Sequence, residues 1–369
     1  MPQKRTTPSI VEVAAKAGVS IQTVSNVLNF PERVKLKTRE RVMSAVESME
    51  YTPNLSARRL RSKKSSSLAV RLDANATVDN EPRGLFTGFI QNDFVFQLVE
   101  AADSREIKVV VYTADSPELE LMKLKRFIKS RDVDGLILTS TEEKDLRLKF
   151  LESHDVPFLS FGRPWGAKNL YSTSHPWIDV DGASGTALAT EMFFERGCSS
   201  IGYLGWVSPQ FDRSAAHSVG DDRFLGWYNT VLQHKLPKRN AGLVGGNDPL
   251  AKQFALVKDS VEFGREGVRK LIKSFPKIDA IVCATDTLAL GAVLELRQLN
   301  LEDILVSGFD NTPVSKEFGF SSLEQNLSLV ANSALTVLMG QEGNQIRKVD
   351  FGVESTSAHV LLKPKLIIR

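Results

Sequence analysis

The signals that begin and end two short helices are crowded into residues 9–20, and they constrain the local structure more than any other feature. Ser9 and Glu12 form the pattern of a capping box, in which the serine accepts from the first helical turn and the glutamate reaches back. This pattern predicts a helix over residues 10–17. Gly18 can then adopt the left-handed conformation that ends the helix.

A second and a third helix are expected to follow closely. Ser20 can cap a helix over residues 21–28, and Thr38 can cap a later helix whose apolar face comprises Val42, Ala45, Val46 and Met49. Two short helices joined by a tight glycine-containing turn make a helix-turn-helix, and the third helix would close its core. The first part of the chain is thus expected to be a small all-α domain.

The outer face of the second helix carries an unusual mixture of side chains. Gln22 and Asn26 have the amide pattern that pairs with adenine, and an exposed Ile21 can contact a thymine methyl group. We expect these three side chains to contact bases. Contacts to DNA phosphates are expected from Thr23, Ser25 and Asn29. The alternative for Ile21, Gln22 and Asn26 is that they are ordinary surface residues of a small helical domain.

The charge of the chain is unevenly distributed. Residues 1–66 carry 13 Lys and Arg against 5 Asp and Glu, whereas the remaining residues carry 34 against 39. A basic end on a mildly acidic body is typical of a module that binds a polyanion and is attached to a second domain. The alternative is a solvated basic tail, but a tail would not carry apolar residues at helical spacing.

Residues 54–61 have the composition of a short DNA-contacting helix. Asn54 can cap it, Ala57 is small enough for two such helices to approach closely, and Leu60 can act as an apolar wedge. The wedge is flanked by residues that can bind phosphates, namely Arg58, Arg59 and Arg61. The alternative is a disordered basic linker, since eight residues are too few for a stable isolated helix.

The body of the chain alternates short β-rich apolar runs with helical stretches. The runs are 68–72, 109–112, 135–139, 158–161, 201–205, 280–284 and 304–308. This alternation predicts βαβ units and parallel sheets, and the length is sufficient for two of them. Ligands of open α/β sheets bind beyond the carboxyl ends of strands, so the residues that follow each run are the candidates for a binding site.

Charged and indole side chains occupy those positions. The candidate ligand-binding residues are Arg163, Trp165, Asp181, Trp206, Arg223, Asp286 and Asp310. Such groups suit a polyhydroxylated ligand such as a sugar or nucleoside. Several have a structural alternative: Asp286 can be a helix N-cap, Asp179 can cap a helix over residues 183–194, and Trp177 and Trp206 can belong to the core.

The segment from Ser9 to Ser62, with its AGVS turn and TVSNVLN helix, resembles the DNA-binding end of LacI-type repressors. The body resembles the effector domain of that family, which is similar to periplasmic sugar-binding proteins, through the motifs DVDGLIL, VDGASGT, GDDRFLGW, CATDTLALG and GFDN. The resemblance implies a helix-turn-helix domain over 1–52, a hinge helix and linker over 53–66, and a two-lobed domain over 67–369.

The resemblance also implies a function. Family members are transcription regulators that bind palindromic operator DNA as homodimers, insert a hinge leucine into the minor groove, and respond to a small ligand between the lobes. Arg223 and Asp310 match positions that hold the ligand in the family. The chain departs from the family pattern at Thr285, where sugar-responsive members often have Asn. It also departs in the segment 73–92, which is longer than the loop usual at this place in the family.

Other classes of protein are disfavoured by what the sequence lacks. No apolar run approaches the length of a membrane span, and Glu12 and Lys16 interrupt the place of a signal peptide, so a cytoplasmic protein is expected. Cys198 and Cys283 stand far apart without a metal-binding pattern, so no metal or other cofactor is expected. Nucleophile-elbow, P-loop and zinc-protease motifs are absent, which disfavours an enzyme. A transport-type solute-binding protein is the alternative function.

Overall fold

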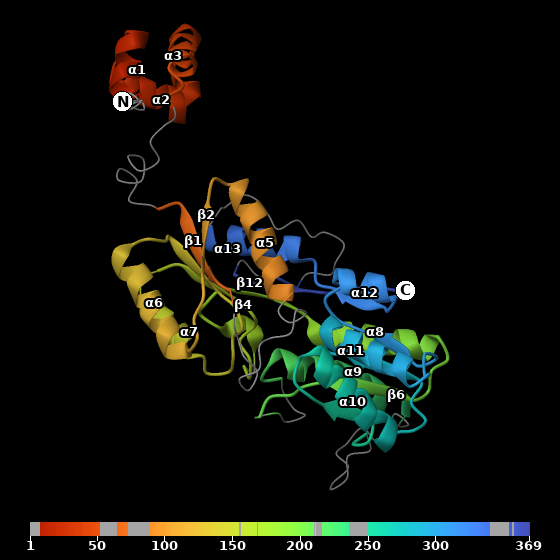
Figure 1. Ribbon diagram of the computed structural model, residues 1–369. Helices are drawn as coiled ribbons and strands as arrows, with labels where there is room; N and C mark the ends of the chain where they lie inside the picture. Colours follow the sequence, from red (N-terminus) through yellow and green to blue (C-terminus); the bar gives the residue numbers. More distant parts are fainter. Residues whose placement is uncertain are drawn as a thin grey trace, which may run out of the picture. The chain divides into compact units, whose positions relative to one another are not determined.

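The computed structural model describes residues 8–51, 65–72, 89–154, 156–167, 169–209, 211, 216–235, 250–339, 354–355 and 358–369. The chain divides into two compact units, Met1–Ser65 and Ser66–Arg369 (Figure 1). The expected hinge helix, with Arg58, Arg59, Leu60 and Arg61, lies outside the described residues, as does most of the segment 73–92. None of the described helices is long and apolar enough to cross a membrane.

The first unit is the expected bundle of three α-helices. They are α1 (Ile10–Ala17), α2 (Ile21–Asn29) and α3 (Leu36–Ser48), with a 3-10 turn η1 (Pro31–Arg33) before α3. The capping box of Ser9 and Glu12 is present, Gly18 ends α1 in the left-handed conformation, and Ser20 caps α2. The core comprises Val13, Ala14, Ala17, Val24, Val27, Val42, Ala45 and Tyr51.

The predicted cap of the third helix is wrong. The helix begins at Leu36, the N-cap position is Lys35, and no side chain caps this end. Thr38 lies within the first turn, where its backbone N–H donates to the carbonyl oxygen of Lys35. The chain is extended at Val34 and becomes helical only at Leu36, which is 60% exposed, so water can satisfy the first backbone N–H groups of α3 in place of a side-chain cap.

The second unit contains two lobes, each built on a parallel sheet. The sheet of the first lobe has the strand order β11-β12-β5-β4-β3-β1-β2, and all pairs are parallel except β11 with β12. Its strands are β1 (Ser67–Arg71), β2 (Lys108–Tyr112), β3 (Gly135–Leu138), β4 (Phe158–Phe161), β5 (Trp177–Val180), β11 (Glu354–Ser355) and β12 (His359–Leu362).

Helices cover both faces of this sheet. The helices α5 (Phe89–Asp103) and α13 (Leu327–Met339) pack together on one face, where Phe94, Leu98, Val330 and Leu335 contribute to the core. On the other face, α6 (Pro117–Ser130) and α7 (Leu146–Glu152) bury Leu124 and Leu151. A 3-10 turn η2 (Leu170–Ser172) precedes β5.

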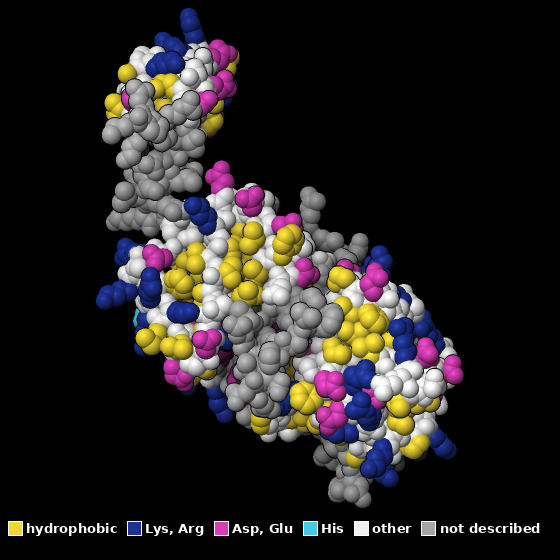
Figure 2. Space-filling model, viewed as in Figure 1, with side chains coloured by type: hydrophobic (Ala, Val, Ile, Leu, Met, Phe, Trp, Pro, Cys, Tyr) yellow, Lys and Arg dark blue, Asp and Glu magenta, His cyan; other side chains and the backbone are white. Residues whose placement is uncertain are grey.

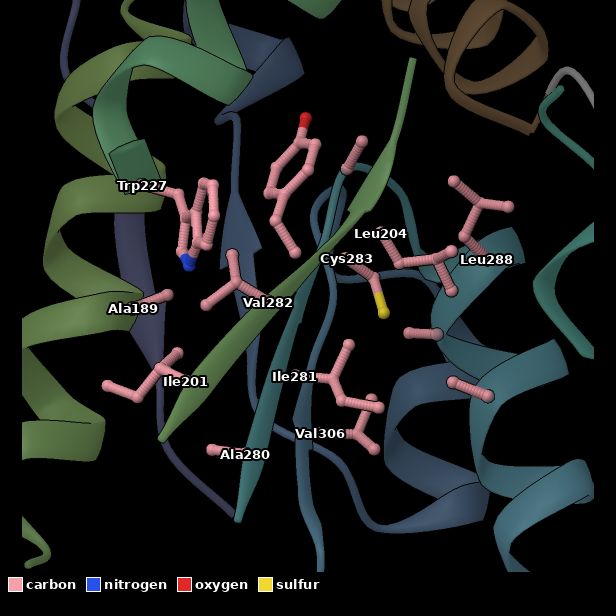
Figure 3. Packing of buried hydrophobic residues seen from close by; sticks show 14 of the residues in the cluster. Ala189, Ile201, Leu204, Trp227, Ala280, Ile281, Val282, Cys283, Leu288 and Val306 are labelled. Carbon is pink, nitrogen blue, oxygen red and sulfur yellow. The ribbon is translucent and has the colours of Figure 1, made fainter. Parts of the chain in front are cut away.

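The second lobe repeats the plan on a smaller sheet, of order β7-β6-β8-β9, whose described strand pairs are all parallel. Its strands are β6 (Ile201–Gly205), β7 (Phe254–Leu256), β8 (Ala280–Cys283) and β9 (Leu305–Ser307). The helices are α8 (Gly182–Glu195), α9 (Val219–Lys235), α10 (Val261–Ser274), α11 (Asp286–Gln298) and α12 (Pro313–Phe318). Figure 3 shows Trp227 and Leu288 on opposite sides of the strands.

Three stretches of chain connect the lobes. The first runs from β5 into α8, the second from β10 (Ser322–Glu324) into α13, and the third from β12 into β13 (Lys365–Ile367). The strands β10 and β13 pair in an antiparallel manner and belong to the second lobe, since α8 contacts both. Each lobe is therefore assembled from distant parts of the sequence, as the resemblance implied.

The predicted strand runs coincide with β1, β2, β3, β4, β6, β8 and β9 to within about one residue at each end. The strand β5 was not predicted. Its first residue, Trp177, is fully buried, in agreement with the prediction that this side chain can belong to the core. Cys283 also lies in the core, and Cys198 packs at its edge; both are free thiols.

The packing of α8 against α9 depends on Gly226. A Cβ atom at this position would collide with the carbonyl oxygen of Ala183 and with Oγ1 of Thr186. Thr186 Oγ1 also donates to the carbonyl oxygen of Arg223, at 2.7 Å, so the two helices approach backbone to backbone. This close approach fixes where the amino-terminal end of α9 lies.

We predict that Gly226→Val lowers the free energy of unfolding of the second unit by about 1–3 kcal/mol, the usual range for overpacking. Because all four tryptophans lie in this unit, urea unfolding followed by tryptophan fluorescence measures it directly. Asn229→Val, at an exposed position on the same helix, controls for the helix propensity of valine. Equal stabilities of the two variants would contradict the packing argument.

Candidate functional site

The exposed face of α2 presents the three residues expected to contact bases. The Ile21 side chain is 43% exposed, and Gln22 is exposed beside it. Gln22 Nε2 donates a hydrogen bond to Asn26 Oδ1, at 3.1 Å, so the two amides lie one helical turn apart on the same face. The arrangement offers a pair of amides next to an apolar side chain.

The residues expected to contact phosphates are spread along the same helix, with Thr23 in its first turn. The Thr23 backbone N–H donates to Ser20 Oγ, at 3.1 Å, and the two hydroxyls are 2.8 Å apart. Thr23 and Ser25 are half-buried, and Asn29 is the last residue of α2, with its side chain outside the described part. The capping bond holds the first turn of α2 in place, where backbone N–H groups favour an anion.

A buried arginine links the two lobes. Arg163 follows β4 in the first lobe and is 7% exposed. Its Nε donates to Asp179 Oδ2 at 2.6 Å, and its Nη2 lies 3.2 Å from Asp222 Oδ2 on α9 of the second lobe. Burial raises the pKa of the Asp222 carboxyl to about 6, while the charge of Arg163 acts to lower it. The guanidinium is thus fully engaged by the protein itself.

The helix cap at the first crossover is Asp181, not Asp179. Asp179, expected as a possible helix cap, instead binds Arg163. Asp181 is the N-cap of α8 and accepts from the Ser184 backbone N–H at 3.0 Å. The helix begins at Gly182, so Asp181 stands directly before it, whereas Asp179 lies inside β5.

Arg223 is the centre of a second buried cluster, within the second lobe. Its Nη1 donates to the carbonyl oxygen of Ala284 at 2.6 Å, and its guanidinium lies 3.9 Å from the ring centre of Phe309. Nη2 lies 3.8 Å from Asp310 Oδ1. The structure thus brings together Arg223 and Asp310, the two residues expected to hold a ligand, and leaves Arg223 Nε as a buried donor without a partner among the described residues.

Asp310 is held in an unusual conformation. Its backbone φ is 118°, in a region that favours glycine, and its Oδ1 accepts from Gln325 Nε2 at 2.6 Å. Burial raises the pKa of this carboxyl to about 8, and Arg223 opposes the rise. Strain at a residue that also has a displaced pKa is characteristic of functional sites.

Asp286 is not the helix cap that the sequence allowed. Thr285 is the N-cap of α11, and Asp286 is the first helical residue. The Asp286 carboxylate accepts from the backbone N–H and hydroxyl of Thr312, at 2.7 and 2.8 Å, and from the Ser322 hydroxyl at 2.5 Å. Its hydrogen bonds therefore fix the loop that carries Asp310.

The two candidate tryptophans lie in different places. Trp165 is 6% exposed, and the Arg163 guanidinium lies 5.1 Å from its ring centre. Trp206 follows β6, is half-buried against the core of the second lobe, and lies so close to Gly220 that a Cβ there would collide with the indole. Trp165 therefore belongs with Arg163, and Trp206 lies beside the start of α9.

Sequence reasoning missed several partners in these clusters. One missed partner is Asp222, which stands next to Arg223 in the motif GDDRFLGW and binds Arg163. Another is Asp221, whose carboxylate accepts hydrogen bonds from the backbone N–H and the hydroxyl of Ser208 in the loop after β6. A second contact between the lobes joins Glu143 Oε2 to His217 Nδ1 at 2.7 Å. Only the run of charges in GDDR hinted at this, because pairing across lobes has no local sequence signal.

Known regulators resemble the chain over most of its length. The regulator CelR of Thermobifida fusca is 27% identical over 342 residues, which cover 91% of this chain and 92% of CelR. The regulator MalR of Streptococcus pneumoniae is 27% identical over 310 residues, covering 82% and 83%. RafR of Escherichia coli is 26% identical over 361 residues, covering 96% of both chains. All three are described as helix-turn-helix transcriptional regulators.

Solved structures share the fold. A complex of CelR with cellobiose has a TM-score of 0.64 and 24% identity, and it covers 98% of this chain and 99% of that one. A lac repressor dimer bound to operator and the anti-inducer ONPF has a TM-score of 0.68 and 22% identity, covering 98% of both. Both contain the helical unit and the two α/β lobes in this order.

Family models match part of each unit. The model of bacterial regulatory proteins of the lacI family matches residues 9–54, which include α1, α2 and α3. The model of periplasmic binding protein-like domains matches residues 190–369, which include most of the second lobe. These relatives are transcription regulators, not enzymes. The chain belongs to the LacI family of helix-turn-helix transcriptional regulators, with a periplasmic-binding-protein-like ligand-binding domain.

Proposed function

We propose that this regulator is a repressor that binds a palindromic operator as a homodimer and is controlled by a sugar or sugar-like metabolite in the cleft between its lobes. The observation that carries the proposal is the pair of amides formed by Gln22 and Asn26 on the exposed face of α2. In DNA such a face can exchange its internal hydrogen bond for bonds to base edges in the major groove.

Direct reading of bases is assigned to Ile21, Gln22 and Asn26, and the register on the duplex to Thr23, Ser25 and Asn29. Arg58, Arg59 and Arg61 are assigned to phosphates, and Leu60 to the minor-groove wedge. A dimer would place two α2 helices about one helical turn apart on the DNA, so the operator should have twofold symmetry.

The effector is assigned to the residues that converge at the carboxyl ends of the strands. Arg223 and Asp310 offer a donor and an acceptor, and the surrounding set comprises Arg163, Trp165, Asp181, Trp206 and Asp286. Hydrogen-bonding charges beside aromatic faces suit a polyhydroxylated ring. The CelR complex with cellobiose supports this class of ligand.

Control of DNA binding is assigned to opening and closing of the lobes. Arg163 and Arg223 are each 7% exposed, and Arg163 pairs across the lobes with Asp222. A ligand can enter only when the lobes separate, and it shifts the equilibrium by its differential affinity for the open and closed forms. The Arg163–Asp222 and Glu143–His217 contacts contribute to the closed form.

The first lobe presents an apolar surface suited to the second subunit. Phe96 and Val99 of α5 are 58% and 44% exposed, and Val111 of the neighbouring edge strand β2 is 43% exposed. Hydrophobic side chains are visible over this part of the lobe in Figure 2. Burying such a patch in a dimer removes apolar area from water.

A cytoplasmic location follows from this role, since a regulator must reach the chromosome. The alternative of a transport-type binding protein is disfavoured, because the curated relatives match the helix-turn-helix as well as the lobes.

We predict that genomic fragments selected by the purified protein share a palindrome of about 14–20 base pairs. Gln22→Ala should weaken the complex with that palindrome by about 1–3 kcal/mol and relax the sequence preference at one position of each half-site. Val11→Ala, at an exposed position of α1, is the control. Selection of fragments without a shared palindrome would contradict the proposed reading of DNA.

Arg223→Ala is predicted to remove the response to effector while leaving operator affinity unchanged. Cellobiose and a panel of other mono-, di- and trisaccharides would first be tested for a rise in the melting temperature of the wild-type protein. The active sugar should then fail to stabilise the variant or to change its operator affinity. A normal response by the variant would place the ligand elsewhere.

Asp310→Asn is predicted to become more stable, relative to wild type, as the pH rises. The folded protein holds a proton on Asp310 up to about pH 8, while the unfolded chain releases it near pH 4, so wild type loses stability between these values. Urea unfolding across this range measures the difference. Asp303→Asn, at an exposed carboxylate before β9, is the matched control, and a pH-independent difference for Asp310→Asn would refute the titration.

Phe96→Glu is predicted to convert the dimer into monomers, because a carboxylate cannot be buried unpaired in an apolar interface. Analytical ultracentrifugation gives the mass in solution, and Leu146→Glu, at another exposed apolar position of the first lobe, is the control. A variant that remains dimeric would assign the interface to a different surface.

A further inference from the structure

Two loops of the first lobe meet the segment of the second lobe that leads into α9. One loop follows β3 and carries Glu143, and the other follows β4 and carries Arg163 and Gly166. The Gly166 backbone N–H donates to the carbonyl oxygen of Ala216 at 3.1 Å. Together with the pairs made by Arg163 and Glu143, this bond gives three polar contacts between the lobes. All three join protein groups directly, so none of them requires a molecule between the lobes.

Arg163 uses its whole guanidinium group for the protein. Nε donates to Asp179 Oδ2 at 2.6 Å, Nη1 to Asp222 Oδ1 at 3.3 Å, and Nη2 to the carbonyl oxygen of Val180 at 3.0 Å. The ring of Trp165, which is 6% exposed, covers the group. Each guanidinium nitrogen therefore has a protein partner, and the pair with Asp222 serves to hold the second lobe.

The second charged contact involves a histidine that its own lobe holds in place. His217 Nδ1 lies 2.7 Å from Glu143 Oε2, and the two side chains are 15% and 27% exposed. The hydrogen bond from His217 lowers the pKa of the Glu143 carboxyl, so the acceptor is ionised. The His217 backbone N–H donates to Asp221 Oδ2 at 2.9 Å, and Asp221 also binds Ser208. A group that is ordered in advance loses little freedom when the lobes meet.

Separating the lobes removes strong partners from both acidic side chains. Asp222 is 6% exposed, and of its printed carboxylate contacts it would keep the bond from the Ala183 backbone N–H, at 3.0 Å. Glu143 would keep Lys144, whose Nζ lies 3.6 Å from Oε1 and whose side chain is 83% exposed. An exposed pair of that kind contributes little. A charge-assisted hydrogen bond typically biases an equilibrium about tenfold or more, so the two charged contacts favour joined lobes.

We propose that these three contacts form a latch, which keeps the lobes joined before any effector binds. Opening of the latch then sets how fast an effector reaches Arg223 and Asp310. The affinity changes little, because the same contacts stabilise the joined lobes with and without the effector. Entry of the effector rests on the proposed function, whereas the latch itself does not.

The first test measures the separation of the lobes without any effector. In the full-length protein, spin labels are attached at Lys129→Cys on α6 and Lys273→Cys on α10, which are exposed positions of different lobes. Cys198→Ser removes the half-buried thiol, and Cys283 is fully buried. Labelled chains are assembled with an excess of unlabelled chains, so that pulsed electron paramagnetic resonance reads distances within one subunit. The parent should give one distance population.

Glu143→Lys removes the acceptor of His217 and places a cation beside it. This variant should raise the ratio of separated to joined lobes about tenfold, and adding Asp222→Asn, which weakens the second charged contact, should raise it further. Glu142→Lys, the same charge change at an exposed neighbour, should match the parent. The latch is refuted if the parent shows mostly separated lobes, or if neither latch variant differs from Glu142→Lys.

The second test follows cellobiose by stopped-flow tryptophan fluorescence, with the panel of saccharides as further probes. The association and dissociation rates should both rise about tenfold in Glu143→Lys, with an unchanged dissociation constant, and Glu142→Lys should behave as the parent. A weaker dissociation constant at an unchanged association rate would show lobes already apart in the free protein, which overturns the latch. If no saccharide binds, the proposed effector class fails, and the spin-label distances still decide the latch.

Discussion

The ion pairs of Arg163 are the interaction on which the second unit depends. One guanidinium bonds Asp179, at the end of the first lobe's sheet, and Asp222, on the first turns of a helix of the second lobe. Desolvating three charges is costly, and their attraction offsets that cost only while the geometry holds. Separating the lobes would break the Arg163–Asp222 pair and leave the guanidinium with its first-lobe partners, Asp179 and the carbonyl oxygen of Val180.

This dependence explains why the surrounding chain is so fully hydrogen-bonded. Asp181 caps α8 beside the pair, Asp221 holds the loop before α9, and Asp286 holds the loop that carries Asp310. Each carboxylate fixes backbone near the cleft, leaving Arg223 Nε as the buried donor without a partner among the described residues of that cluster. A rigid frame around one unsatisfied donor is an arrangement that discriminates between ligands by hydrogen bonding.

Local signals in the sequence were sufficient for the small helical unit and for seven strands. The capping box at Ser9, the left-handed Gly18 and the cap at Ser20 act within a few residues, so they are visible without tertiary structure. The roles of Asp179, Asp181 and Asp286 could not be predicted from local sequence. Each role depends either on a partner far away in the sequence or on which of two neighbouring residues begins the helix. The Thr38 cap was wrong because the helical backbone begins at Leu36, which places Thr38 inside the first turn of α3.

The return of the chain to both lobes at β12 and β13 has a consequence for biosynthesis. The strand β12 completes the first lobe next to β5, and β13 pairs with β10 in the second lobe, so neither lobe has all of its strands until residues 359–367 are synthesised. The three-helix unit is made first and has its own core. During synthesis the helix-turn-helix unit can therefore fold before either lobe of the ligand-binding domain has all of its strands.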